Sequence, residues 1–209
     1  MAPSPPLTKP DLRIFLQQLQ ANPSDIRCWP LPLRISLLRN QTLDLTIYGR
    51  RIISVPRLAL MAVSPAVLAA VAKDPRIPAI NFSFDVPGVE IFGKQNVKKM
   101  SDEKIKHHEG ALRAFAHWLT AVCTAAPVAL AGTTFQEEVC LRFMCRLLDM
   151  DDYAQHLIDK FIAQAGTSSL TPQHVQDLAL SCRGTDDPLL KVLAGKIVEM
   201  KINRDGDVV

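Results

Sequence analysis

The sequence predicts an α+β fold: a small three-stranded sheet packed with a helical cluster and followed by C-terminal helices. Two periodicities carry this prediction. Apolar residues alternate with polar ones in short stretches near 43–55 and 80–84, as in half-buried strands. From residue 112 onward they recur every three or four positions, as in amphipathic helices. Fifteen prolines and only nine glycines indicate helices with sharp ends.

The composition fits one folded domain with extensions. The chain has 209 residues, of which 48% are apolar and 22% charged, enough to bury a core. A net charge of +3 is too small to indicate a nucleic-acid or membrane partner.

Residues 1–40 are expected to be a proline-rich N-terminal extension with one short helix. This helix starts at Lys9-Pro10-Asp11 and ends at Asn22-Pro23. Residues 29–32, Trp-Pro-Leu-Pro, are expected to be extended because each proline biases its predecessor away from the helical region. The extension either packs on the core or lends a swapped element to a dimer. The helix carries apolar residues at helical spacing: Leu12, Phe15, Leu16 and Leu19.

The next elements are a hairpin, two short helices and a third strand. The hairpin pairs residues 43–48 with 52–55 through a turn at Gly49-Arg50. The helices cover 57–63 and the stretch from Ser64-Pro65, a cap with a first-turn proline, to Asp74-Pro75. The third strand covers 80–84.

Residues 85–109 show neither periodicity and carry several lysines. We expect a solvated surface insertion, with a dedicated binding loop as the alternative. The lysines are Lys94, Lys98, Lys99, Lys104 and Lys106.

Five helices are expected after the insertion. The first runs from about 112 to Ala126-Pro127, and the second, opened by Thr133 or Thr134, from about 135 to 147. The third is capped by Asp151 or Asp152 and ends at Gly166. The last two cover about 172–181 and 188–200, where a Thr or Asp cap precedes a first-turn proline.

Two stretches carry a family resemblance. In residues 43–67, an acid (Asp44) lies in a hydrophobic strand, and after a turn come 53–60, Ile-Ser-Val-Pro-Arg-Leu-Ala-Leu, and 64–67, Ser-Pro-Ala-Val. This arrangement resembles the opening of a BTB/POZ domain. Residues 115–120, Phe-Ala-His-Trp-Leu-Thr, are similar to a helix end in BTB-like domains of filamentous fungi. The resemblance covers about 41–200. It implies a BTB/POZ-like domain at 41–165, with the insertion 85–109, and a C-terminal helical extension at 166–209.

The resemblance also implies two candidate contact sites. Asp44 and Arg57 match an acid and a base that line a charged pocket in dimeric members; the alternative is an ordinary surface pair. Phe135 and Glu137 have the hydrophobic-x-Glu form with which adaptors contact a cullin. Phe135 is equally explained as the start of a core stripe.

No catalytic, cofactor or metal motif is present in the sequence. We find no G-x-S-x-G, P-loop, G-x-G-x-x-G, H-E-x-x-H or C-x-x-C pattern. Without a secretory signal we expect an intracellular protein, cytoplasmic or nuclear, with its five cysteines as free thiols. Cys140 and Cys145 fall among apolar residues, where a buried thiol is inert.

These observations favour a non-enzymatic protein–protein interaction module, a scaffold or adaptor that forms a homodimer or a heteromeric complex. We expect docking through helix faces, because the apolar content of the short helix 57–63 is too rich for one compact core, notably at Leu58, Leu60, Met61 and Val63. One alternative is a substrate adaptor of a cullin-type ubiquitin ligase. A further alternative is a nucleic-acid-associated factor that contacts phosphate through Lys94 to Lys106. An enzyme with an unfamiliar site is the last class.

Overall fold

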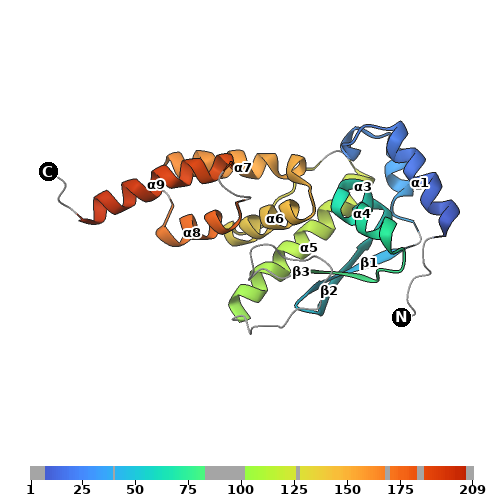
Figure 1. Ribbon diagram of the computed structural model, residues 1–209, viewed down its shortest axis with the longest axis horizontal. Helices are drawn as coiled ribbons and strands as arrows, with labels where there is room; N and C mark the ends of the chain where they lie inside the picture. Colours follow the sequence, from blue (N-terminus) through green and yellow to red (C-terminus); the bar gives the residue numbers. More distant parts are fainter. Residues whose placement is uncertain are drawn as a thin grey trace.

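The computed structural model has a mixed α+β fold, with a small sheet toward one end and a group of C-terminal helices extending to the other (Figure 1). It describes residues 8–39, 41–82, 102–125, 128–167, 170–182 and 186–205. One hydrophobic core runs from Phe15 to Leu193. The described parts of the three predicted regions, 1–40, 41–165 and 166–209, therefore share this core.

The sheet has three strands in the order β2-β1-β3. β1 (Thr42–Ile47) pairs antiparallel with β2 (Arg50–Pro56) and parallel with β3 (Ala79–Phe82). The hairpin turn lies at Tyr48 and Gly49, with φ of 49° and 79°, one residue earlier than expected. Two consecutive positive φ angles are typical of a type I′ turn, whose twist matches that of the strands.

Two short helices connect β2 to β3. They are α3 (Arg57–Val63) and α4 (Pro65–Lys73), with bounds close to those expected. The Ser64 hydroxyl accepts the amide hydrogen of Val67 and donates to the carbonyl of Leu148, so the predicted cap also ties α4 to a distant segment.

α3 does not present an apolar face to a partner, so that expectation is wrong. Leu60, Met61 and Val63 are at most 2% exposed, and Leu58 packs against the same core. The chain's own core accounts for the apolar content of this helix.

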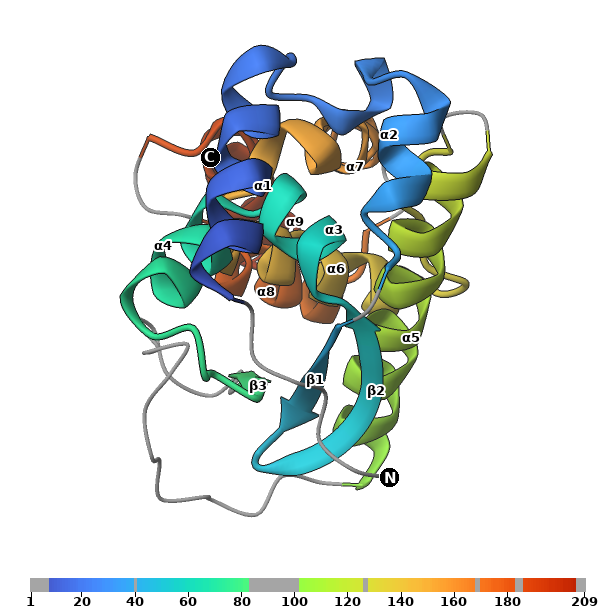
Figure 2. The ribbon, with the colours of Figure 1, turned by 90° about the vertical axis from the view of Figure 1, so that its right-hand side faces the viewer.

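α5 (Asp102–Thr124) is longer than expected because it starts inside the predicted insertion. Residues 102–109 form its first turns, which corrects the expected bounds 85–109. The rest of the insertion, including Lys94, Lys98 and Lys99, lies outside the described residues. Figure 2 shows α5 running along β2, and Leu112, Phe115 and Leu119 on α5 are fully buried.

Four helices complete the chain. They are α6 (Phe135–Leu147), α7 (Asp151–Gly166), α8 (Pro172–Leu180) and α9 (Pro188–Asp205), and Figure 1 shows them side by side at the end opposite α1. Thr171 caps α8 as predicted, and Thr134, one of the two candidates, caps α6. The cap predicted for α7 is wrong: Met150 is its N-cap, and the two aspartates lie in the first turn, where their charge favours the helix dipole.

The N-terminal segment contains more structure than the one helix expected. α1 (Lys9–Ala21) is followed by the 3-10 helix η1 (Ile26–Cys28) and by α2 (Leu31–Ser36). The extended conformation expected for 29–32 is therefore wrong from Leu31 onward. Pro30 is the N-cap and Pro32 lies in the first turn, where no backbone hydrogen bond is needed.

This segment packs on the chain's own core. Ile26 and Trp29 are buried, and the Ile26 amide donates to the Tyr153 hydroxyl at 3.0 Å. Arg27 lies over the ring of Tyr153, 4.9 Å from its centre.

Candidate interaction surface

Asp44, the first predicted site residue, lies on the central strand. Its carboxylate accepts a hydrogen bond of 2.6 Å from the Ser54 hydroxyl on the neighbouring strand. It also forms an ion pair of 3.1 Å with Arg51, whose side chain is 56% exposed. These contacts explain Asp44 as a cross-strand partner within the hairpin.

Arg57, the second, begins α3 and is 5% exposed. Its guanidinium donates to the Pro75 carbonyl at 2.8 Å, while its Nε has no hydrogen-bond partner among the described residues. Burial lowers the pKa of Arg57, and the negative charge of Asp74 opposes this effect. The structure thus gives Asp44 and Arg57 separate partners, and a shared pocket stays a prediction.

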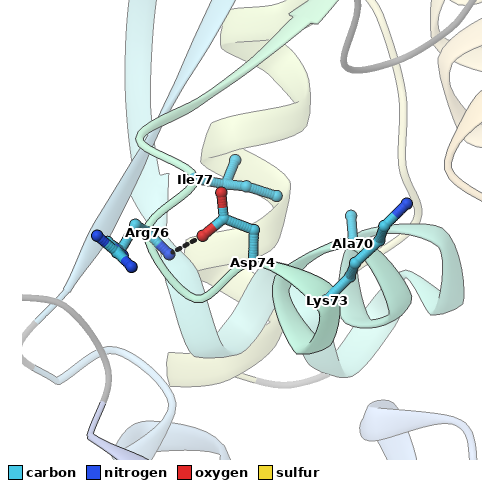
Figure 3. Close-up of a pocket in the computed structure, with 5 residues that line it drawn as sticks. All are labelled: Ala70, Lys73, Asp74, Arg76 and Ile77. Carbon is cyan, nitrogen blue, oxygen red and sulfur yellow. Dashed lines mark hydrogen bonds between the residues drawn. The ribbon is translucent and has the colours of Figure 1, made fainter.

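The turn that Arg57 supports borders an open depression of about 720 Å³ (Figure 3). In this view the Asp74 carboxylate accepts the backbone hydrogen of Arg76 at 2.9 Å. Both signs of charge meet here, and few apolar side chains line the hollow, so it lacks the enclosed apolar walls of a small-molecule site. The lining residues are Ala70, Lys73, Asp74, Arg76 and Ile77.

Phe135 and Glu137, the predicted cullin contact, both have roles inside the fold. The Phe135 ring packs on Phe161 and His174, with ring centres 5.6 and 4.3 Å apart. Glu137 accepts the amide and the hydroxyl hydrogen of Thr133, at 2.8 and 2.6 Å. It acts as the acidic half of a capping arrangement at the start of α6.

The electrostatics of Glu137 agree with this role. Partial burial raises the pKa of Glu137. The hydrogen bonds that its carboxylate accepts from Thr133 and from the backbone of Thr134 lower the pKa by more, so it lies below its usual value of 4.5. A contact with another protein would have to compete with these hydrogen bonds.

Burial affects the thiols of several cysteines. All five are free in the structure, and Cys28 is exposed. Burial raises the pKa of Cys123 to about 11 and that of Cys140 to about 12, and raises that of fully buried Cys145 further. In the parts of the chain that the structure describes, no group of three His, Cys, Asp or Glu side chains is placed to hold a metal ion.

Buried arginines that the sequence did not single out join distant segments at helix ends. On α6, Arg142 donates to the Ser181 carbonyl at 2.7 Å and forms an ion pair of 2.5 Å with Asp187. Arg146 donates to the carbonyls of Ser181 and Cys182. These carbonyls lie at the C-terminal end of α8, where helical partners are missing. We call this group, residues 142, 146, 181, 182 and 187, the α8 clasp.

Arg34 does the same for α5. It lies on α2, is 8% exposed, and donates to the carbonyls of Val122 and Ala125 at 2.6 and 2.9 Å. Figure 2 shows α2 beside the C-terminal end of α5. Nothing in the local sequence marks Arg34, because its partners lie 88 and 91 residues away.

Several apolar side chains on α2 and just after α5 are exposed. Leu31 and Ile35, one turn apart on α2, are each 42% exposed, and Val128 is 46% exposed. The indole nitrogen of Trp118 donates to the Val128 carbonyl at 2.9 Å and holds that segment against α5. We call this the α2 surface and define it by six exposed residues: Pro30, Leu31, Pro32, Ile35, Ala125 and Val128.

Five of the six residues of the α2 surface lie in two stretches without charge, and the sixth, Ile35, directly follows Arg34. Between Arg113 and Glu137 the sequence has no Asp, Glu, Lys or Arg, and residues 28–33 have none either. Other large apolar side chains are exposed elsewhere, on α1 (Ile14), α8 (Leu180) and α9 (Ile197 and Val198). Exposed apolar side chains on their own are ordinary, and contiguous patches of several hundred Å² are the ones that are typical of interaction sites.

No described helix has both the length and the apolar character needed to cross a membrane. Comparisons with protein-family models, with curated proteins and with solved structures each found no match.

Proposed function

We propose that this protein is a non-enzymatic protein–protein interaction module, a scaffold or adaptor subunit with a BTB-like architecture. The observation that carries the proposal is the α2 surface. Its apolar side chains are exposed on α2 and just after α5, and five of its six residues lie in stretches of the chain without charge. Depletion of charge at the centre of a patch distinguishes protein interfaces from the rest of a protein surface.

The order of the elements supports the BTB-like part of the proposal. From β1 the described chain runs strand, strand, helix, helix, strand, then a segment outside the described residues, then five helices, of which the last two form the C-terminal extension. The resemblance implies this same order. The free thiols favour a reducing compartment, so we place the protein inside the cell.

Affinity co-purification of the tagged full-length chain from its native cell, quantified by mass spectrometry, tests the function. We expect the chain itself or one other protein at near-stoichiometric level. Leu31→Glu should abolish the recovery, because it places a charge on the α2 surface. Leu180→Glu on α8 is the matched control, since Leu180 is 65% exposed and lies away from α2. Recovery of no protein above background, with the chain monomeric, would refute the function.

The same experiment tests the cullin alternative. Near-stoichiometric recovery of a cullin would make the protein a ligase adaptor. Because Glu137 is held by Thr133, the contact would then have to use the exposed part of Phe135 and its neighbours. The nucleic-acid alternative rests mainly on lysines outside the described residues. Several phosphate contacts would lower the affinity for nucleic acid about 10³-fold between 50 and 200 mM salt. An affinity that does not change over this range would exclude the alternative.

A further inference from the structure

We propose that α1 is a displaceable helix. It covers an apolar part of its own chain's core, which we call the α1 seat, and an amphipathic helix of another protein takes this seat when α1 leaves it. The partner helix would carry apolar side chains at the spacing found on α1. This inference goes beyond the proposed function, because it concerns a contact other than the α2 surface.

One apolar face attaches α1 to the core. Phe15 is 2% exposed, and Leu12 and Leu19 are partly buried against the same core. Together with Leu16 they have the i, i+3, i+4, i+7 spacing of a single helix face. Figures 1 and 2 both show α1 beside α3 and α4. The seat therefore fits a helix with an apolar stripe and a large side chain near the middle of it.

No polar contact fastens α1 to the seat. Among the described residues, no hydrogen bond or ion pair joins the side chains of 10–21 to another element. The ends of the helix find their partners locally. The Thr8 hydroxyl accepts the amide hydrogen of Asp11 at 3.3 Å, and the Asn22 side-chain amide donates to the Gln18 carbonyl at 2.8 Å. α1 can therefore leave the core as a helix without breaking a hydrogen bond to the rest of the chain.

The segment that follows α1 is attached in a different way. The Ile26 amide donates to the Tyr153 hydroxyl, and Arg34 donates to two carbonyls at the end of α5. The connection between the two parts has an extended backbone at Asn22 and is exposed at residues 23–24. Undocking of α1 at this connection leaves η1 and α2 in place. The N-terminal segment thus combines an anchored part with a helix that has apolar attachment only.

This attachment makes α1 a competitor for any helix that fits the seat. A competing helix shifts the equilibrium from docked to undocked α1, because it binds only the state in which the seat is open. Its apparent affinity for the natural chain is reduced by the fraction of chains in which the seat is open. Binding through the apolar face of an amphipathic helix is a recurring mode of protein recognition.

Hydrogen exchange of the natural full-length chain, read by mass spectrometry, tests whether α1 undocks. We expect the amides of α1 to be at least about 100-fold less protected than those of α5 and α7, because undocking requires only local opening. Equal protection of α1 and α5 would overturn the inference.

A fluorescently labelled peptide with the sequence of residues 8–22 tests whether the seat accepts a helix from outside. The full-length Phe15→Ala chain has a loosened α1, so we expect it to bind the peptide at least about 10-fold more tightly than the natural chain does. In the peptide, Phe15→Asp should abolish binding. Ile14→Asp is the matched control and should not, because the Ile14 side chain is 56% exposed.

Three results of the peptide experiment would count against the inference. They are no binding to the Phe15→Ala chain, equal binding of the two Asp peptides, and dimers of the natural chain that Phe15→Ala abolishes, since these would show α1 exchanged between two copies. Circular dichroism checks that the Phe15→Ala chain is folded. If it is not, hydrogen exchange of the natural chain decides.

Failure of this inference is distinguishable from failure of the proposed function. A chain that loses its partner through Leu31→Glu but has a fully protected α1 would overturn the displaceable helix and leave the function standing. A chain that binds the peptide as expected but recovers no protein from the cell would refute the function and leave the seat standing.

Discussion

Removing the carboxylate of Asp187 should strongly destabilise the C-terminal helices. Asp187 and Arg142 form an ion pair of 2.5 Å between side chains that are only 6% and 5% exposed. The other carboxylate oxygen of Asp187 accepts the amide hydrogen of Leu189 at 3.0 Å, at the start of α9. Arg146 lies close enough for its positive charge to interact with that of Arg142, so Asp187 compensates two cations.

The expected cost follows from burial. Truncating one partner of a buried ion pair leaves the other charge without compensation, which costs about 3–5 kcal/mol. About 1 kcal/mol of this for Asp187→Ala reflects the lost helix cap. Domains of this kind have unfolding free energies of about 5–15 kcal/mol, so the loss is a large fraction of the total.

Urea denaturation followed by two signals measures this cost. Circular dichroism reports all helices, whereas fluorescence reports the two buried tryptophans, Trp29 and Trp118, neither of which belongs to the α8 clasp. If the clasp fails locally, helical signal should be lost at lower urea than tryptophan fluorescence. Arg50→Ala is the control. The Arg50 side chain is 74% exposed, so its ion pair with Glu109 should contribute at most about 1 kcal/mol to the unfolding free energy.

A double-mutant cycle completes the test. Arg142→Met with Asp187→Ala should cost less than the sum of the single changes, because the double variant leaves no stranded Arg142 charge. If Asp187→Ala costs less than about 1 kcal/mol, or if the two changes are additive, the assignment of the α8 clasp as a buried electrostatic contact is wrong.

Three further outcomes are expected. Gly132→Ala should lower the unfolding free energy by about 1–3 kcal/mol in urea titrations, because an added Cβ would lie 2.9 Å from backbone in the first turn of α6; an unchanged midpoint would contradict this packing. The pKa of Glu137 lies below 4.5, so its contribution to stability is present above the unfolded value and is lost as pH falls through the folded value. Thr133→Ala should raise this pKa toward 4.5 in an NMR titration, and no change would show that the hydroxyl is not its partner. In native alkylation at pH 8 read by mass spectrometry, exposed Cys28 should be labelled and buried Cys145 only after denaturation; equal rates would argue against the described core.

Much of the fold was predictable because the signals are local. Strand alternation operates over two residues, and helix caps act between a side chain and an amide three residues later. Ser64, Thr134 and Thr171 were therefore identified from sequence, and the structure shows each one accepting such a hydrogen bond. Where the local signal was mixed, the prediction failed. Residues 29–32 read as extended because of their prolines, yet Pro32 is compatible with the first turn of α2.

The candidate site was harder to predict from the sequence than the fold. The resemblance selected Glu137 for a partner contact, but the tertiary structure places its carboxylate against the N-terminal cap of α6. The contact of Arg34 with the end of α5 is not predictable from the sequence, since a single arginine after a proline-rich stretch forms no recognisable motif. The sequence does show that residues 114–136 carry no charge. Combined with a prediction of the helix α2, this observation would indicate the α2 surface.

The fold class, the order of most elements and the positions of several helix starts follow from the amino-acid sequence alone, because these depend on residues within one or two turns of each other. Which apolar and charged groups are exposed depends on the tertiary structure. In the folded chain α3 is buried and Leu31 and Ile35 are exposed. Arg34 and Arg142 form hydrogen bonds with helix ends 88 and 39 residues away. Exposure depends on what packs across a residue, and that contact comes from parts of the chain too distant for any local pattern to specify.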